Sequence, residues 1–512
     1  MTIALRAVLL MMLISGCSRS EKQATTSSRP PSIVLITIDT LRADHLGCYG
    51  YAPYREPVSP EIDRFAESAV RFTNCFAPRA QTMPSLTSML TGMYPSRHGI
   101  LENAQALAPS TRTMFAILAD QGYDTAAFIS FVPAGRDGNP APGAALLSTG
   151  SDTGPGGPKL VSTWEKDANT ALKAIEWLKG RDPHSSRPFF VWIHFYDVHH
   201  PYGPAAPFDR MFTGDYHGPL LVREGAPEPE FGTVSKRLDE AALRNAPLDA
   251  ADHAYVLALY DGSIRGVDRH VGAILRTLEE KKLSATTGVI VTADHGEELG
   301  EHNDYYYHGN SVYDGALRIP LLMRWPAKTE PKVVDQLVQN VDLLPTILEW
   351  IGIDGSDPLE GISFAGTLGS GASTTPPARR NAAYSEWQDL IVSVRTLEWK
   401  YIFNPQGAHP KKPPYYDDRT SKKGFQVDCE ELYDMRQDSK EAVNLVKSDS
   451  TQAASLRALA IEHRGRPGAG QVMIPTEEGA VTEELRSLGY VGAPADRSDV
   501  ILNAQHCERS ES

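Results

Sequence analysis

The chain has 512 residues, of which 41% are hydrophobic, so it is long enough to bury a substantial core. Its formal net charge is −14 at pH 7, and such an acidic chain offers no basic face to neutralise a phosphate backbone. We therefore expect no nucleic-acid partner.

The N-terminal residues predict export. One arginine precedes an apolar run at residues 7–14, which is too short to span a bilayer and is typical of a signal peptide. The sequence Ile14-Ser-Gly-Cys17 resembles the bacterial lipobox, so cleavage after residues 1–16 would leave Cys17 as a lipidated N-terminus, with an ordinary cleavable signal as the alternative. Residues 17–31, rich in Ser, Thr and Pro, would form a flexible tether. We expect an exported bacterial lipoprotein, anchored at the periplasmic face of the outer membrane or at the cell surface.

Three nearly continuous apolar runs predict buried strands. They cover residues 32–38, 189–195 and 288–293. The first run ends at Asp39 and the last at Asp294, and in open α/β sheets ligands gather outside the carboxyl ends of the strands. We therefore expect both carboxylates at a site, with a helix-capping or turn aspartate as the alternative at either position.

The run at residues 189–195 leads into Asp197, His199 and His200. Adjacent carboxylate and imidazole groups at a strand end suit either metal binding or proton transfer. The alternative is that these histidines only pack or form hydrogen bonds in the core. Strand alternation gives neither His194 nor His199 a role, so we expect both to be structural.

The segments around this run differ in regularity. Residues 133–157 and 204–251 are irregular, with little apolar periodicity, and predict loops or lid insertions that form substrate-selecting walls. Residues 254–283 carry apolar side chains at helical spacing, which predicts a long surface helix packed on the sheet.

The C-terminal third predicts a smaller subdomain. A stretch rich in Gly, Ser, Thr and Pro precedes three short strands at residues 383–387, 391–395 and 399–403. We divide the chain after the tether into a catalytic domain at 32–352, a C-terminal α+β subdomain at 353–492 and a tail at 493–512.

Residues 82–92 read Thr-Met-Pro-Ser-Leu-Thr-Ser-Met-Leu-Thr-Gly. They resemble the nucleophile segment of the sulfatases, which carry Cys or Ser, then x-Pro-Ser-Arg and Leu-Thr-Gly, and which oxidise the first residue to formylglycine. Here Thr82 occupies the nucleophile position, and its branched side chain is not a substrate for that oxidation. Leu86 replaces the arginine. The nearby Cys75 is followed by Phe-Ala-Pro-Arg, which places proline one residue too late, so we expect a packed thiol.

Further segments extend the resemblance to the alkaline phosphatase and sulfatase superfamily. They follow the superfamily's order and spacing at residues 39–50, 94–99, 292–302, 316–326, 341–347 and 431–434. The resemblance implies an α/β fold in which helices sandwich a mostly parallel central sheet. It also implies a smaller antiparallel sheet near the C-terminus.

The resemblance implies one metal site, whose ligands would be Asp39, Thr82, Asp294 and His295. Two carboxylates, one imidazole and one alkoxide suit Mn or Zn, and suit Ca less well because Ca prefers all-oxygen shells. Sulfatases carry a second aspartate directly after the first, where this chain has Thr40. That difference weakens a calcium sulfatase interpretation.

A second metal is implied by a likeness to the nucleotide pyrophosphatase/phosphodiesterases, in which an aspartate and a histidine before x-x-Gly-Pro and a histidine before glycine bind zinc. The matching residues are Asp197, His200 and His308, although the aspartate lies three residues upstream rather than four. Otherwise His200 would be the general acid, as the histidine of His-x-Pro-Tyr is in sulfatases, and His308 would contact a non-bridging oxygen. Asn103 resembles the phosphodiesterase asparagine that donates to a phosphoryl oxygen, with an ordinary loop asparagine as the alternative.

The sequence favours phosphate over sulfate. Sulfatases continue after the segment matching residues 114–128 into Gly-Lys-Trp-His, whereas this chain continues as Ile-Ser-Phe-Val-Pro. The chain therefore lacks most of the residues that sulfatases use to hydrolyse sulfate esters. Phosphoryl transfer needs only an aligned nucleophile, charge stabilisation and a metal. We expect a metal-dependent hydrolase or transferase, a phosphodiesterase, phosphatase or phosphotransferase, acting on a small-molecule, lipid-headgroup or glycan ester. The alternatives are a sulfatase that works without formylglycine and a non-catalytic metal-binding surface protein.

Overall fold

The computed structural model describes most of the chain after the predicted tether. The described residues are 30–131, 133, 139–152, 163–200, 202–218, 220, 249–303, 305–309, 311–326, 328–353, 359–369, 379–388, 390–410, 428–466 and 500–501. From Pro31 the chain forms one compact unit. The predicted signal peptide, the lipid attachment at Cys17 and most of the predicted tether and tail lie outside the described residues. Among the helices within these ranges, none combines the length and apolarity needed to cross a bilayer.

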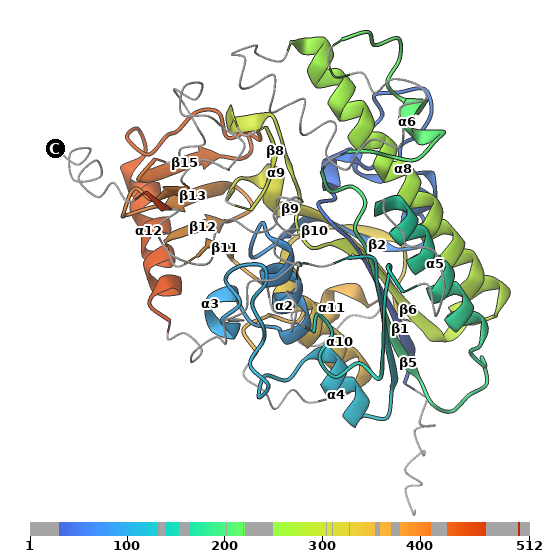
Figure 1. Cartoon of the computed structure of the whole chain (residues 1–512). Coiled ribbons are helices and arrows are strands. Elements are labelled where there is room, and N and C mark those ends of the chain that lie inside the picture. Colours follow the sequence, from blue (N-terminus) through green and yellow to red (C-terminus); the bar gives the residue numbers. More distant parts are fainter. Residues whose placement is uncertain are drawn as a thin grey trace, which may run out of the picture. The chain divides into compact units, whose positions relative to one another are not determined.

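An eight-stranded sheet forms the centre of this unit (Figure 1), in the order β10-β2-β9-β6-β1-β5-β3-β4. The strands are β1 Ser32–Ile38, β2 Val70–Phe76, β3 Asp124–Ile129, β4 Leu146–Thr149, β5 Phe189–Phe195, β6 Thr287–Ala293, β9 Arg318–Arg324 and β10 Lys332–Gln339. Neighbours pair in parallel except at β9, which is antiparallel to both β2 and β6. The expected mostly parallel α/β sheet is confirmed.

The register of the central strands brings three strand ends to one edge of the sheet. Every residue of β1 is buried, as expected for a strand covered on both faces. Its last residue, Ile38, pairs with Phe195 of β5 on one side and with Ala293 of β6 on the other. The residues that follow these three strands therefore leave the sheet close together.

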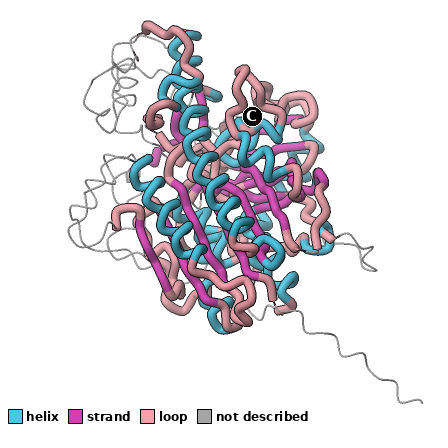
Figure 2. Tube along the Cα trace, turned by 90° about the vertical axis from the view of Figure 1, so that its right-hand side faces the viewer, coloured by secondary structure: helices cyan, strands magenta, loops and turns pink. Residues whose placement is uncertain are grey.

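Helices cover both faces of the sheet, as Figures 1 and 2 show. On one face, α5 (Thr163–Lys179) packs beside the long α8 (Ala250–Glu280), which confirms the helix predicted at 254–283. A capping box formed by Asp249 and Asp252 begins α8. The opposite face carries α2 (Thr82–Thr91), α4 (Met114–Asp120) and α10 (Leu343–Ile351).

A four-stranded antiparallel sheet follows in the C-terminal third, in the order β11-β12-β13-β15, with α12 (Ser450–Arg464) packed against it. Its strands are β11 Ala383–Trp387, β12 Ile391–Arg395, β13 Trp399–Phe403 and β15 Glu430–Asp434. The first three have the predicted bounds. Shorter elements are η1 Ala43–His45, η2 Gly47–Tyr49, α1 Pro60–Ala66, α3 Pro95–His98, α6 Phe208–Met211, η3 Ser284–Thr286, β7 Glu298–Leu299, η4 Glu301–Asn303, β8 Tyr305–Tyr307, α9 Asp314–Leu317, η5 Asn340–Asp342, α11 Ala365–Leu368, β14 His409–Pro410 and β16 Val500–Ile501.

Part of the stretch predicted as a loop at 133–157 is a strand. Leu146–Thr149 form β4, which pairs in parallel with β3 at the edge of the sheet. Both Leu146 and Leu147 are exposed, so this short strand lacks the apolar pattern of the buried ones. The stretch at 204–251 contains the short helix α6, and most of the rest lies outside the described residues.

Three cysteines lie among the described residues. Cys75 is a free thiol buried in the core, as expected, and burial raises its pKa well above the usual range. Cys48 is also free, and Cys429 is disulfide-bonded.

Candidate active site

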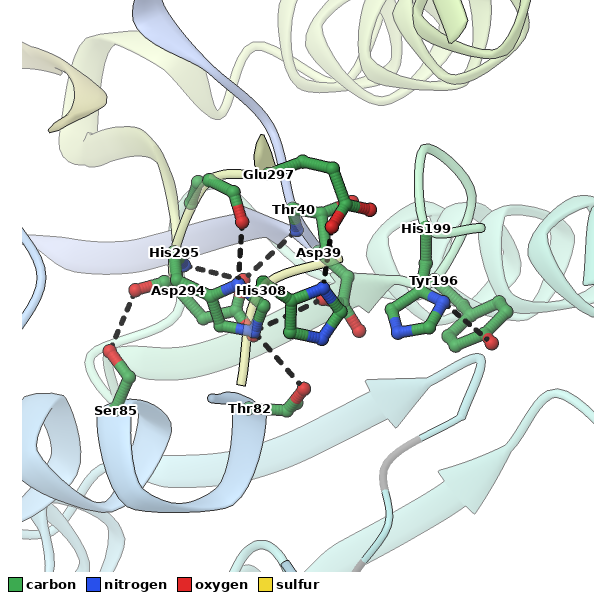
Figure 3. Close-up of polar contacts among 12 residues, drawn as sticks. Asp39, Thr40, Thr82, Ser85, Tyr196, His199, Asp294, His295, Glu297 and His308 are labelled. Carbon is green, nitrogen blue, oxygen red and sulfur yellow. Dashed lines mark hydrogen bonds and ion pairs between the residues drawn. The ribbon is translucent and has the colours of Figure 1, made fainter. Parts of the chain in front are cut away.

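Four of the predicted site residues meet at the carboxyl edge of the sheet (Figure 3). His295 Nε2 lies 3.3 Å from Thr82 Oγ1, 3.4 Å from Asp294 Oδ2 and 3.7 Å from Asp39 Oδ1. All four side chains are fully buried. Asp39, Asp294 and His295 each offer a ligand atom within 4.8 Å of the others, a spacing that suits one metal ion.

The Asp294 carboxylate fits a divalent cation. Its Oδ1 accepts the backbone N–H groups of Thr40 and His295, at 3.3 and 2.8 Å. Its Oδ2 is buried and has no hydrogen-bond partner among the described residues. Burial raises the pKa of this carboxyl, and a bound cation would supply the positive charge that a buried carboxylate needs.

Thr82 is the first residue of α2, so the helix directs its N-terminus at the site. The Ser85 N–H donates to the Gln81 carbonyl, the Met83 N–H donates to Asn103 Oδ1 at 3.0 Å, and proline at position 84 has no N–H. Asn103 is therefore a buried residue beside the nucleophile rather than an ordinary surface loop residue. Its Oδ1 accepts this N–H, and its Nδ2 group is the donor of the same side chain.

A hydrogen-bond network fixes α2 against the end of β6. The Ser85 hydroxyl donates to the Asp294 carbonyl at 2.7 Å. The amide of Asn340 donates to Ser85 Oγ and to the same Asp294 carbonyl, both at 3.0 Å. These bonds set the distance between Thr82 on the helix and the ligand residues that follow the strand.

Two strained residues occupy the turns that carry the site. Thr40 has φ of 54° and Val198 has φ of 141°, values that branched side chains rarely adopt. The Tyr260 hydroxyl, from α8, donates to the Thr40 carbonyl at 2.8 Å and accepts the Arg42 N–H at 3.0 Å. Thr40 stands where sulfatases carry their second aspartate, and it contributes its backbone N–H to Asp294.

A second group lies beside the first and contains His199, His200 and His308. The ring centres of His308 and His295 are 4.5 Å apart. Glu297, fully buried, accepts from Nδ1 of His308 at 2.8 Å, and its other oxygen lies 3.8 Å from Nδ1 of His200. Burial alone would raise the pKa of the Glu297 carboxyl, but His308 and His200 hold it well below its usual range. Burial lowers the pKa of His308 to about 4 and that of His199 well below its usual value.

The sequence suggested that Asp197 lies with His200 and His308. The structure instead places His199 with those two histidines. The Asp197 N–H donates to Asp167 of α5 at 2.9 Å, and the Asp197 side chain bonds with Thr163 at the start of that helix. Burial and the nearby Asp167 charge raise the pKa of Asp197 well above its usual range. The turn after β5 therefore directs the carboxylate toward α5, and His199 takes the place expected for it.

The structure places His199, which we expected to be structural, in a candidate cluster with His200 and His308. Residues 199–202 read His-His-Pro-Tyr, so His199 itself fits the His-x-Pro-Tyr pattern of sulfatases. His194, in contrast, lies in the core, where its Nδ1 is 2.8 Å from Thr37 Oγ1. Glu297 was not predicted either, although it lies two residues after His295 in a recognised segment.

Helices on both faces of a mostly parallel sheet, with carboxylate, imidazole and hydroxyl groups at its carboxyl edge, define an ester hydrolase of the alkaline phosphatase superfamily. Members of this superfamily typically bind divalent metals. The Sulfatase family model matches residues 31–353, more than half of the chain. The protein therefore belongs to the sulfatase family.

Individual relatives are distant. The N-acetylglucosamine-6-O-sulfatase of Bacteroides thetaiotaomicron is 23% identical, over 85% of this chain and 86% of that protein. PehA of Trinickia caryophylli, a multifunctional alkaline phosphatase superfamily protein, is 25% identical, over 66% of this chain and 77% of that protein. The crystal structure of the phosphonate monoester hydrolase of Agrobacterium radiobacter has a TM-score of 0.63 and 22% identity, over 85% of this chain and 95% of that one. At this identity the structural match shows the fold alone.

Proposed function

We propose that the protein cleaves or transfers phosphoesters, with Thr82 as the nucleophile. The metal ligands would be Asp39, Thr82, Asp294 and His295. The observation that carries the proposal is the position of Thr82 Oγ1, which belongs to the first residue of α2 and lies 3.3 Å from His295 Nε2. A divalent metal held there would lower the pKa of the hydroxyl and stabilise charge on the phosphoryl group. Mn or Zn suits the mixed oxygen and nitrogen donors better than Ca.

In this mechanism Thr82 Oγ1, having lost its proton to solvent, attacks phosphorus in line with the leaving oxygen. The bond from phosphorus to that oxygen breaks, a phosphothreonine forms, and His200 gives the leaving oxygen a proton. Water or an acceptor alcohol then displaces Thr82. We assign the Thr82 N–H and the Asn103 amide to a phosphoryl oxygen. Thr82 begins α2, and the Asn103 side chain is held beside it by the Met83 N–H.

A sulfatase that works without formylglycine is the second candidate, since the chain belongs to the sulfatase family. The relative named N-acetylglucosamine-6-O-sulfatase supports a glycan ester as one substrate class, and lipid-headgroup esters remain another. A non-catalytic metal-binding role is the third candidate. The complete set of four candidate ligands argues against it.

We also propose that the protein is exported and attached to a membrane through a lipid on Cys17, with periplasmic or cell-surface placement. Only the sequence of residues 1–17 supports this. Labelling cells with a radioactive fatty acid would test it, because Cys17→Ala should abolish incorporation into this protein. Incorporation that persists in the variant would contradict the proposal.

The test of function compares rates on bis-p-nitrophenyl phosphate, p-nitrophenyl phosphate and p-nitrophenyl sulfate with the full-length protein in Mn²⁺ or Zn²⁺. We expect a phosphate ester to be preferred and Thr82→Ala to abolish turnover. Thr87→Ala, on the same helix and also buried, is the matched control and should keep the wild-type rate. Mass spectrometry of rapidly acid-quenched enzyme should place the phosphoryl group on Thr82. Preferential cleavage of sulfate, or activity retained by Thr82→Ala, would contradict the proposal.

A further inference from the structure

A buried arginine, Arg79, lies three residues before Thr82, on the loop between β2 and α2. Its Nη1 group donates to the carbonyl of Glu386, a residue of β11, at 3.1 Å. Its Nη2 group donates to Gln81 Oε1 at 3.2 Å and to Glu102 Oε1 at 2.8 Å. The guanidinium group therefore joins the segment before the nucleophile, the segment of Glu102 and the C-terminal sheet.

Two partners of this arginine directly precede the residues that we assign to a phosphoryl oxygen. Gln81 is the N-cap residue of α2 and is followed by Thr82, and its side chain makes no cap hydrogen bond of its own. Glu102 is followed by Asn103. A guanidinium group is planar and presents its donors in a fixed fork. Because both partners are bound to this one group, it sets the position of the Asn103 amide relative to the Thr82 N–H.

The C-terminal sheet makes a second contact with Glu102. Gln388, which directly follows β11, donates from Nε2 to the same Oε1 at 3.0 Å. Gln388 has φ of 51°, and Ala104, directly after Asn103, has φ of 62°. Residues other than glycine rarely adopt these left-handed values, and surrounding contacts must hold them there. Two such residues beside one carboxylate point to a geometry that the fold maintains at an energetic cost.

We propose that Arg79, Glu102 and Gln388 are positioning residues that hold the Asn103 amide beside the Thr82 N–H. The C-terminal sheet thereby takes part in building the phosphoryl site. The inference rests on the proposed function, because Asn103 and Thr82 are its phosphoryl contacts. A purely structural ion pair would change the stability of the protein without acting through Asn103.

The test measures the affinity of the full-length, metal-loaded protein for orthovanadate by isothermal titration calorimetry. Vanadate stands in for the pentacoordinate phosphoryl group. Asn103→Ala should weaken binding by about 10–100-fold, because it removes one hydrogen bond to a charged group. Glu102→Ala should weaken it by about 10-fold, because the amide remains but is no longer held in place. Gln388→Ala removes only one bond to Glu102 and should weaken it by about threefold.

A double variant separates positioning from stability. If Glu102 acts through Asn103, adding Glu102→Ala to Asn103→Ala should not weaken vanadate binding further. Glu102→Ala should still lower the free energy of unfolding in urea in both backgrounds, because Arg79 loses its carboxylate partner. Asp124→Ala is the matched control, since Asp124 is also a partly exposed carboxylate paired with an arginine, Arg181, but lies at the amino end of β3. It should keep the wild-type affinity.

We expect Glu102→Ala to fold, because Arg79 keeps its other two hydrogen bonds and the Glu102 side chain is already 26% exposed. Circular dichroism of each variant checks this. If Glu102→Ala does not fold, Gln388→Ala, alone and combined with Asn103→Ala, makes the same comparison.

Three results would overturn the inference. They are a wild type that does not bind vanadate, wild-type affinity in both Glu102→Ala and Gln388→Ala, and an equal weakening by Glu102→Ala with and without the Asn103 amide. Failure of the proposed function is separate. The expected vanadate pattern without a preference for phosphate esters would keep the positioning role and remove the function. Thr82-dependent phosphoester turnover with wild-type vanadate affinity in both variants would keep the function and remove the positioning role.

Discussion

The network that ties α2 to β6 makes a specific prediction for Ser85→Ala. The hydroxyl of Ser85 donates to the Asp294 carbonyl at 2.7 Å and accepts from Asn340 at 3.0 Å. Ser88 is one turn further along the same helix and equally buried, and its hydroxyl forms a hydrogen bond with His98 at 3.0 Å. Ser88→Ala is therefore the same chemical change on the same helix without a link to the site.

The expected magnitudes follow from these contacts. A buried hydrogen bond contributes about 1 kcal/mol net, so Ser85→Ala should destabilise the protein by about 2 kcal/mol and Ser88→Ala by about 1 kcal/mol. Only Ser85→Ala should also slow catalysis, because it loosens the position of Thr82 relative to His295. A misplacement of about 1 Å costs up to about 100-fold, so we expect kcat to fall by about 10–100-fold.

Urea unfolding of the metal-loaded proteins and steady-state kinetics on bis-p-nitrophenyl phosphate would measure the two effects. The reasoning holds if both variants lose stability and only Ser85→Ala loses kcat. A kcat of Ser85→Ala within twofold of the wild type would refute it. Equal losses of kcat in Ser85→Ala and Ser88→Ala would show that general loosening of α2, rather than its link to β6, controls the rate.

Three further outcomes can be measured. Thr82→Cys should not gain efficient p-nitrophenyl sulfate hydrolysis even in a host that makes formylglycine, because Leu86 remains; a strong gain would contradict this. Removing bound metal with a chelator should lower the midpoint of thermal unfolding. Adding back free metal at about 100 times its Kd should restore about 2.7 kcal/mol of the free energy of unfolding. Equal midpoints with and without metal would argue against binding at the buried carboxylates. Burial lowers the pKa of His98 from 6.5 to about 3, so below pH 6.5 the unfolded chain binds more protons than the folded protein. As the pH falls from 6.5 to 5, this group should therefore lower the free energy of unfolding by about 2 kcal/mol. His98→Gln should flatten that pH dependence in urea titrations, and an unchanged slope would contradict the assignment.

Much of the fold could be predicted because buried strands leave a strong pattern. The run at 32–38 and the three short strands after residue 382 were predicted with their observed bounds, since continuous or alternating apolar residues mark them. The strand β4 could not be found in this way. It has four residues, Leu146 and Leu147 are exposed, and its pairing with β3 depends on the tertiary position of the sheet edge.

The residues of the site likewise include some that the sequence could predict and some that it could not. Asp39 and Asp294 directly follow adjacent parallel strands, so the strand register alone brings them together. His199 lies four residues beyond the end of β5, where the turn at Val198 has φ of 141° and strand alternation no longer applies. Glu297 acquires its contact only because the β7–β8 hairpin returns the chain to it at His308. Residues placed by a turn or hairpin need the structure, whereas residues placed by a strand end do not.

Membership of the sulfatase family and a phosphoester reaction are compatible at this nucleophile. The family's arginine position is Leu86, which is buried in the hydrophobic core. An arginine there would have to leave that core or be buried without a partner, at a cost of several kcal/mol. The absence of the arginine therefore agrees with the packing of α2. The Thr82 hydroxyl lies 3.3 Å from His295. A metal bound by His295 and the neighbouring carboxylates would activate this hydroxyl directly, so the proposed reaction does not require formylglycine.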